Sequence, residues 1–274
     1  MPLRLVTLFF IVLFLPASAK AGGWARAEDQ VFIRTGAGFF FGQQPFEVAA
    51  GPSGTFRGSA AEFYGEFGLG ANFEADLSLR WVSNTHDLDE GPSRTRRGLE
   101  DFELLFKWAA VNEGNALSLL AGTRIALYDR LDLERSLVGD PELGPGGADI
   151  LLGLSFGHSF YPAPLWFNLD LIHRLRLASP SSGLLLRSEL GVRPAPPLAF
   201  AAVVELQPAF GRDLDSPSNS PAPVPKAFGL GLKLLLSVAH GFGILGDFLW
   251  FPDVLNDGPG VRFGLGLSYE TPAN

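Results

Sequence analysis

Residues 147–193 decide the fold, and they read GADILLGLSFGHSF (147–160), YPAP (161–164), LWFNLDLIHRLRLA (165–178), SPSS (179–182) and GLLLRSELGVR (183–193). In the middle segment the odd positions are mostly apolar, from Phe167 to Leu177, and the even positions include Asp170, Arg174 and Arg176. An alternation of period two predicts a strand and not a helix. Strands of soluble proteins usually run about five or six residues. Segments of about ten residues with one apolar and one charged face are typical of membrane-spanning barrels.

The same alternation recurs along the whole chain and predicts twelve strands. The other nine cover about 30–41, 59–69, 74–83, 99–111, 116–128, 198–211, 226–239, 244–251 and 260–269. Tight breaks at 70–73, 112–115, 161–164, 194–197 and 240–243 alternate with mostly longer connections at 42–57, 84–98, 130–146, 179–182, 213–225 and 252–259. Such alternation is typical of bacterial barrels with short periplasmic turns and longer extracellular loops. We therefore expect an all-β, antiparallel up-and-down transmembrane β-barrel of about twelve strands. No second domain or plug is expected, and a soluble β-sandwich is the alternative.

Two local features bear on this prediction. Pro208 falls eleven residues past a tight turn, inside the strand 198–211, so the ladder hydrogen bond that it removes should lie near the outer rim. Aromatic residues near the strand ends predict interfacial girdles, with Trp81 and Trp250 near the loops and Trp108 and Trp166 near the turns.

The N-terminus predicts export. Arg4 precedes a short apolar core, 5–15, which is followed by Pro16 and by small residues that suit cleavage near residue 21. We read residues 1–21 as a secretory signal peptide and residues 22–274 as the outer-membrane barrel. An N-terminal anchor helix is the alternative, but the apolar run is too short to span a bilayer. The chain has no cysteine, so neither a lipid-modified cysteine nor a disulfide is expected.

Charge and motifs exclude several function classes. Removal of residues 1–21 takes away Arg4 and Lys20 and no acid, leaving 19 basic and 29 acidic residues, a net charge of −10. A chain this acidic is not expected to bind nucleic acid. The loop around His86, Asp87 and Asp89 lacks the spacing of an EF-hand, and no phosphate-binding loop is present. We expect no metal and no cofactor.

Three stretches resemble a known family. They are Gly23-Trp24 before the first strand, AEFYGEFGLGANFEADLSLRWV (61–82) and GGADILLGLSFGHSFYPAPLWFNLDLIHRLR (146–176). They resemble the MetA-like outer-membrane proteins of the phenol-degradation meta pathway. The chain departs from that family in WARAEDQ (24–30) and in its non-aromatic end, ETPAN (270–274). The resemblance implies a barrel that acts as a transporter or porin.

The polar face of the strands should line the lumen. The expected lining residues are Glu62, Glu66, Asp76, Arg80, Asp101, Glu103, Lys107, Arg124, Asp170, Arg174, Arg176, Arg187, Glu189, Glu205, Lys233, Asp247 and Arg262. Acids dominate strands two to four and arginines dominate strands seven and eight, so an acidic wall would face a basic wall. Such a lumen would pass small polar or zwitterionic solutes. In the alternative, the charges pair, fill the lumen and leave a structural barrel that acts through its surface loops.

A lipid-facing hydrolase is a further hypothesis. Symmetric pairing about 179–182 would set His173 opposite Ser188 on the lipid face, as a base beside a nucleophile. Symmetric pairing about 161–164 sets Leu152 beside His173, so no third group orients the histidine. We expect a non-enzymatic barrel whose partners are outer-membrane lipid, the barrel-assembly machinery during insertion, and a small solute that the sequence does not identify.

Overall fold

The computed structural model describes residues 23–43, 54–89, 91–128, 147–177, 182–210, 227–252 and 260–271. The signal peptide predicted for residues 1–21 lies outside these ranges. Within them, no helix has the length and apolarity needed to cross a bilayer.

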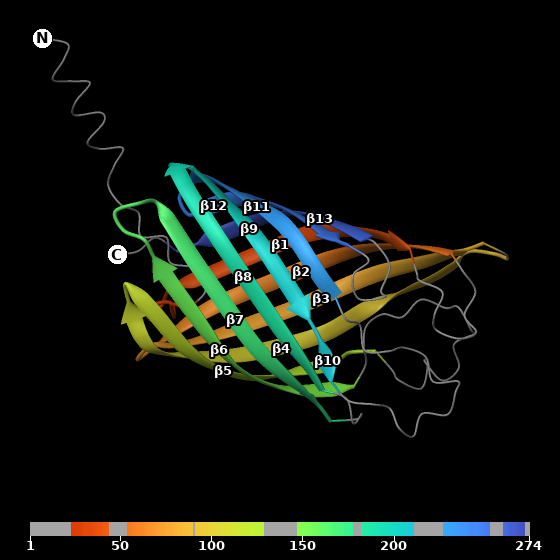
Figure 1. Cartoon of the computed structure of the whole chain (residues 1–274), viewed down its shortest axis with the longest axis horizontal. Coiled ribbons are helices and arrows are strands. Elements are labelled where there is room, and N and C mark those ends of the chain that lie inside the picture. Colours follow the sequence, from red (N-terminus) through yellow and green to blue (C-terminus); the bar gives the residue numbers. More distant parts are fainter. Residues whose placement is uncertain are drawn as a thin grey trace, which may run out of the picture.

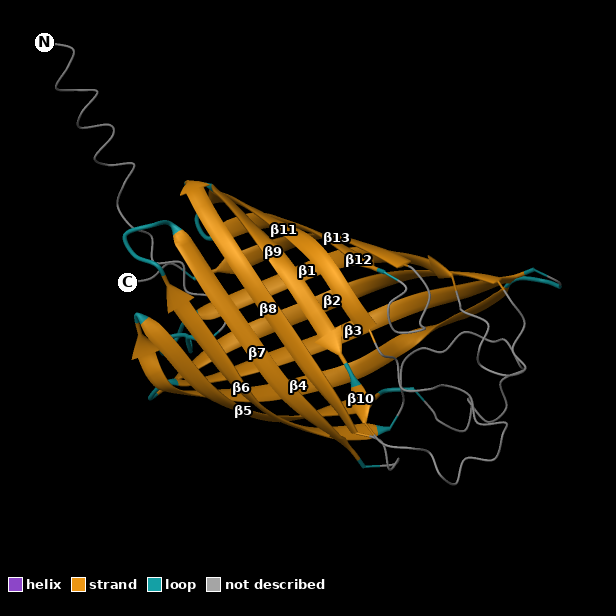
Figure 2. Cartoon of the chain, in the orientation of Figure 1, coloured by secondary structure: helices purple, strands orange, loops and turns teal. Residues whose placement is uncertain are grey.

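The described residues form strands that make one closed sheet (Figures 1 and 2). The strands are β1 (Val31–Gln43), β2 (Gly54–Gly70), β3 (Phe73–Leu88), β4 (Arg94–Glu113), β5 (Asn115–Ala126), β6 (Ala148–Ser159), β7 (Leu165–Arg176), β8 (Ser182–Ala195), β9 (Leu198–Gln207), β10 (Ala209–Phe210), β11 (Ala227–Ala239), β12 (Phe242–Phe251) and β13 (Gly260–Glu270). The short β10 continues β9 beyond Pro208, so the barrel has twelve strands.

Every neighbouring pair of strands is antiparallel, and β1 pairs with both β2 and β13, which closes the sheet. The predicted fold class is therefore confirmed. The tight turns lie at one end, here called the turn end, and the longer connections leave from the other, the loop end (Figure 1). Gly70 and Gly241 occupy two of the tight turns with φ of 82° and 85°. These values suit glycine because a β-carbon disfavours the left-handed region.

Apolar side chains cover the outside of the barrel because the alternation turns them all to one face of the sheet. Exposed examples from around the barrel are Phe39, Phe63, Leu119, Leu154, Leu171, Leu232 and Leu265. Exposed aromatic rings flank this band, with Trp81 and Trp250 toward the loop end and Phe73 and Trp108, stacked at 6.3 Å, at the turn end. The outer surface thus has the apolar band and aromatic girdles that suit a bilayer.

Three details differ from the sequence expectations or sharpen them. The predicted loop 84–98 is mostly strand, because β3 and β4 stay paired as far as His86 opposite Arg94. Trp166 lies near the turn end as expected, but its side chain is buried inside the barrel, so its assignment to a girdle was wrong. Pro208 does interrupt β9 near the loop end, where its carbonyl oxygen accepts a hydrogen bond from the Leu184 backbone N–H.

Candidate channel lumen

The inner face of the barrel carries the charged positions of the alternation. All seventeen residues expected to line the lumen occupy inward register positions on β2 to β13. Most take part in ion pairs between neighbouring strands: Arg34–Glu62, Arg80–Glu100, Lys107–Asp76, Arg124–Asp101, Arg124–Asp149, Arg176–Asp149, Arg187–Glu205 and Arg262–Asp247. Lys233 Nζ reaches past β9 to Glu189 Oε2 at 2.5 Å. The acidic and basic residues are therefore neutralised locally, and the expected acidic wall facing a basic wall is not present as two uncompensated surfaces.

Arg174 on β7 and Glu103 on β4 are exceptions to this local pairing. Within the described residues, neither has an oppositely charged group within the 4.0 Å of an ion pair, although the two interact electrostatically. The Arg174 Nε also lacks a hydrogen-bond partner there.

Apolar side chains fill one side of the lumen. Leu105, Leu120, Leu151 and Ile172 come from four successive strands, β4 to β7, and form one buried cluster with Leu185 beside it. A second cluster joins Trp166 to Ala199, Ala201 and Leu235. On the opposite side, β1 and β13 present glycines to the lumen, with Gly36 opposite Gly266 and Gly38 opposite Gly264. Large apolar side chains therefore occupy the lumen beside β4 to β7, whereas the wall formed by β1 and β13 carries no side chains at these glycines.

The chain before β1 lies inside the barrel at the turn end, so the expectation of no plug was wrong. We call residues 23–30 the N-terminal segment. Trp24 and Ala25 are buried. Ser118 Oγ on β5 donates to the Gly23 carbonyl oxygen at 2.5 Å, and Asn112 binds both the backbone N–H and the carbonyl oxygen of Ala25, at 3.1 and 3.2 Å. The segment therefore runs along the inner wall at the turn end, fixed here by inward side chains of β4 and β5.

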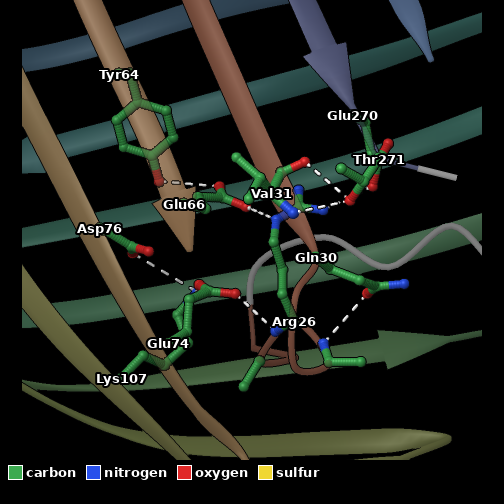
Figure 3. A network of polar contacts seen from close by, with 12 residues as sticks. Arg26, Gln30, Val31, Tyr64, Glu66, Glu74, Asp76, Lys107, Glu270 and Thr271 are labelled. Atoms are coloured by element: carbon green, nitrogen blue, oxygen red, sulfur yellow. Dashed lines mark hydrogen bonds and ion pairs between the residues drawn. The ribbon is translucent and has the colours of Figure 1, made fainter. Parts of the chain in front are cut away.

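Arg26 is the centre of the contacts that this segment makes (Figure 3). Its Nε lies 2.6 Å from Glu66 Oε2 on β2, and its Nη1 lies 2.7 Å from Glu270 Oε1 at the end of β13. Its guanidinium also lies 5.0 Å from the ring centroid of Phe32. Burial opposes the charge, but the carboxylates of Glu66 and Glu270 outweigh it, so the pKa of Arg26 is raised and the side chain stays charged.

The backbone of the segment binds a buried carboxylate. Glu74 Oε2 accepts a hydrogen bond from the Arg26 backbone N–H at 2.7 Å, and Glu74 Oε1 accepts one from Lys107 Nζ at 2.5 Å. Lys107 lies 3.8 Å from Asp76 as well (Figure 3). Lys107 and Arg26 thus supply the positive charge that lets Glu66, Glu74 and Asp76 stay together in a buried site.

Inward glycines provide room for this packing. A β-carbon at Gly157 would meet the Trp24 ring at 2.5 Å, and one at Gly68 would meet the Ala27 carbonyl oxygen at 1.9 Å. Gly191 takes the Trp166 ring in the same way, at 2.0 Å. Large side chains and the N-terminal segment therefore lie flat against the wall only because the wall has no side chain at these places.

Solvent exposure changes from one part of the lumen to the other. Around the N-terminal segment, the side chains of Glu74 and Lys107 are 0% and 9% exposed. Near the middle of two separate strands, β3 and β8, the side chains of Arg80 and Arg187 are 36% and 41% exposed, although both point inward. The lumen is therefore not filled by side chains beside these arginines, whereas protein packs closely around Glu74 and Lys107 at the turn end.

The Ser–His arrangement considered from the sequence does not form. Strands β7 and β8 pair with Leu169 opposite Ser188 and with Leu184 opposite His173. The hairpin is centred two residues earlier than a symmetric loop at 179–182 would require, so the two residues lie four positions out of register, about 13 Å along the strand. The other expectation held, since Leu152 does lie opposite His173. Among the described residues, no group of three or more histidines and acids could hold a metal ion.

Comparison with known proteins gives structural neighbours only. No family model and no curated protein matches the chain. The fold is similar to the translocator domain of autotransporter NalP from Neisseria meningitidis, at 12% identity and a TM-score of 0.56, over 97% of this chain and 93% of that one. It is also similar to the COG4313 outer membrane channel from Pseudomonas putida F1, at 10% identity and a TM-score of 0.58, over 93% and 98%. The beta domain of the Bordetella autotransporter Brka aligns at 14% identity and a TM-score of 0.51, over 91% and 99%. At these identities the similarity establishes the fold, an outer-membrane type of barrel.

Proposed function

We propose that this chain is an outer-membrane channel through which small polar solutes pass along a narrow charged lumen. We assign the loop end to the extracellular side and the turn end to the periplasm. The observation that carries the proposal is the exposure of inward charges: Arg80 and Arg187 are each more than a third exposed inside a closed barrel. Side chains that only filled the lumen would be as buried as Glu74.

The N-terminal segment acts in this proposal as the closed gate of the channel. It lies inside the barrel along the wall at the turn end and is held by hydrogen bonds and ion pairs, through Arg26 and Ala25, and not by a continuous strand ladder. Contacts of this kind can break and re-form without disturbing the barrel wall, whose backbone hydrogen bonds lie elsewhere. Opening would need only the release of this short segment.

The solute class follows from the local pairing of charges. A lumen in which acids and bases alternate along the wall favours solutes that carry both signs, or dipolar neutral ones, over apolar solutes. We keep the relationship to the MetA-like barrels as part of this proposal, on the three stretches that resemble them. The barrel-assembly machinery remains the partner that we expect during insertion.

A structural barrel with a filled lumen is the second candidate, and the tight fit of Trp24 on Gly157 and of Trp166 on Gly191 favours it. Single-channel recording of the purified full chain in planar bilayers separates the two. The channel proposal expects discrete openings, and it expects Arg174→Glu to raise the cation-to-anion permeability ratio, while Arg97→Glu on the outer face leaves that ratio unchanged.

Locking the N-terminal segment tests the gate directly. The chain has no cysteine, so Ala25→Cys with Asn112→Cys introduces a single cysteine pair at a place where the two residues are already hydrogen-bonded. The oxidised protein should be silent and the reduced protein should conduct. If a correctly inserted barrel stays silent after reduction and with Arg26→Gln, the lumen is filled and the channel proposal fails.

A further inference from the structure

The hairpin β3–β4, together with the start of β2, extends farther at the loop end than the rest of the barrel (Figure 1). Pairing continues from Trp81 opposite Leu99 to His86 opposite Arg94, and β2 follows as far as Gly54 opposite Leu88. We call this extension the arm. The outward face of the arm changes from apolar to polar within one row of residues.

Three outward rows follow one another toward the tip of the arm. The first holds Ala61, Trp81 and Leu99, the second Ser59, Ser83 and Arg97, and the third Arg57, Thr85 and Thr95. Trp81 and Leu99 are 44% and 42% exposed, as lipid-facing residues are. Each row rises two residues along the strand, which is about 5 Å along the membrane normal for strands tilted by about 40°. Arg97 and Arg57 thus lie roughly 5 and 10 Å above the aromatic girdle, at the depth of lipid headgroups.

Both arginines keep donors available toward the outside. Arg97 is exposed and uses its Nε for a 3.2 Å hydrogen bond to Ser83 Oγ. Arg57 has a 58% exposed side chain, and Asp87 holds its Nε and Nη2 at 2.9 and 3.2 Å. These contacts orient each guanidinium but use only part of its five N–H groups. The hydroxyls of Thr85 and Thr95, 3.0 Å apart, lie in the same row as Arg57.

We propose that Arg57 and Arg97, with the hydroxyls of Ser83, Thr85 and Thr95, bind a phosphate on the headgroup of an outer-leaflet lipid. Their α-carbons lie two strands and one row apart, about 12 Å, and two arginine side chains can close that distance on one phosphate. Guanidinium groups suit phosphate because they bind its oxygens in pairs. A lipid is the occupant because the site lies on the outward face, directly above residues that contact acyl chains. The site rests on the proposed assignment of the loop end to the extracellular side, but it does not depend on whether the lumen conducts.

Native mass spectrometry of the full-length barrel with added lipid tests the site. The probes are a diphosphorylated lipid A and the same lipid without phosphates. We expect Arg57→Gln with Arg97→Gln to weaken binding of the phosphorylated lipid on the order of tenfold or more, since charge-assisted hydrogen bonds are lost. Arg96→Gln, on the inner face of the same arm, should have no effect.

Two results would overturn the proposal: equal retention of phosphorylated lipid by the double variant, or no preference of the native barrel for the phosphorylated form. Displacement by millimolar inorganic phosphate alone would indicate a free-anion site and would also count against it. Because Arg57 is paired with Asp87, Arg97→Gln alone is the second variant: it removes one surface hydrogen bond, to Ser83, and leaves the Arg57–Asp87 pair intact.

Discussion

Replacing Arg26 by glutamine should shift the N-terminal segment toward release, and the structure sets the size of the shift. The Arg26 side chain makes two ion pairs, with Glu66 at 2.6 Å and Glu270 at 2.7 Å, whereas its backbone bond to Glu74 survives the substitution. Removing one partner of a fully buried pair costs about 3–5 kcal/mol. Glu66 is one-fifth exposed and keeps the Tyr64 hydroxyl as a donor, so we take about 2 kcal/mol for that pair.

The Glu270 side chain is 54% exposed, so this second pair adds only about 0.5 kcal/mol, as surface pairs do. The closed state should then lose about 2–3 kcal/mol, which changes the ratio of open to closed channels roughly 30- to 150-fold. Single-channel recording in planar bilayers measures this ratio as open probability. The free energy of unfolding should fall by no more than this amount, because the strand ladder is untouched.

Glu28→Gln is the matched control, since it removes one charge from an exposed side chain of the same segment. It should leave the open probability within a factor of about two, as exposed charges contribute little. An Arg26→Gln channel that opens no more often than wild type, in a protein that does conduct, would refute the assignment of Arg26 as the latch. A loss of unfolding free energy clearly larger than the predicted shift would instead indicate a role in holding the wall.

Three further outcomes are expected. Gly157→Leu should expel Trp24, because a β-carbon there already meets the ring at 2.5 Å; limited proteolysis should then cut the N-terminal segment at least tenfold faster than in Gly246→Ala, where nothing lies within 4 Å. Arg187→Glu should move the reversal potential toward cation selectivity, because this side chain is the most exposed of the paired inward arginines. Leu265→Arg should destabilise the barrel in bilayers by about 2–4 kcal/mol, measured by reversible unfolding, because it places a charge in the lipid-facing band.

The alternation of apolar and polar residues was enough to predict the twelve strands and their inward faces. The alternation is informative because successive residues of a strand face lipid and lumen in turn, so apolar and polar side chains must alternate. The tight turn at 161–164 also fixed the register of β6 and β7, as Leu152 opposite His173 demonstrates. The next hairpin could not be predicted in this way, since its connection pairs asymmetrically and moves Ser188 four positions from His173.

The arm and the N-terminal segment were missed for a different reason. Beyond Trp81 and Leu99 the residues of the β3–β4 hairpin are mostly polar on both faces, so Asn84 and Thr95 carry no hydrophobic alternation and read as a loop. The N-terminal segment is eight residues long, which is too short to show any periodicity. Its position depends on small residues elsewhere in the chain that leave room for it, such as Gly157 beneath the Trp24 ring. A glycine such as Gly157 indicates a packing site only once the structure places the Trp24 ring against it.

The bond between Arg26 and Glu270 has a consequence for the order of assembly. It joins residues 244 positions apart, and Glu270 is the last residue of the last strand. Its carboxylate reaches the mouth of the barrel only after β13 has joined β1, the step that turns an open sheet into a cylinder. The Arg26–Glu270 contact therefore cannot form before β13 pairs with β1, whichever strands insert first. In a chain in which β13 has not yet paired with β1, Arg26 keeps its ion pair with Glu66 but lacks the one with Glu270. The N-terminal segment is then held less firmly than in the finished barrel.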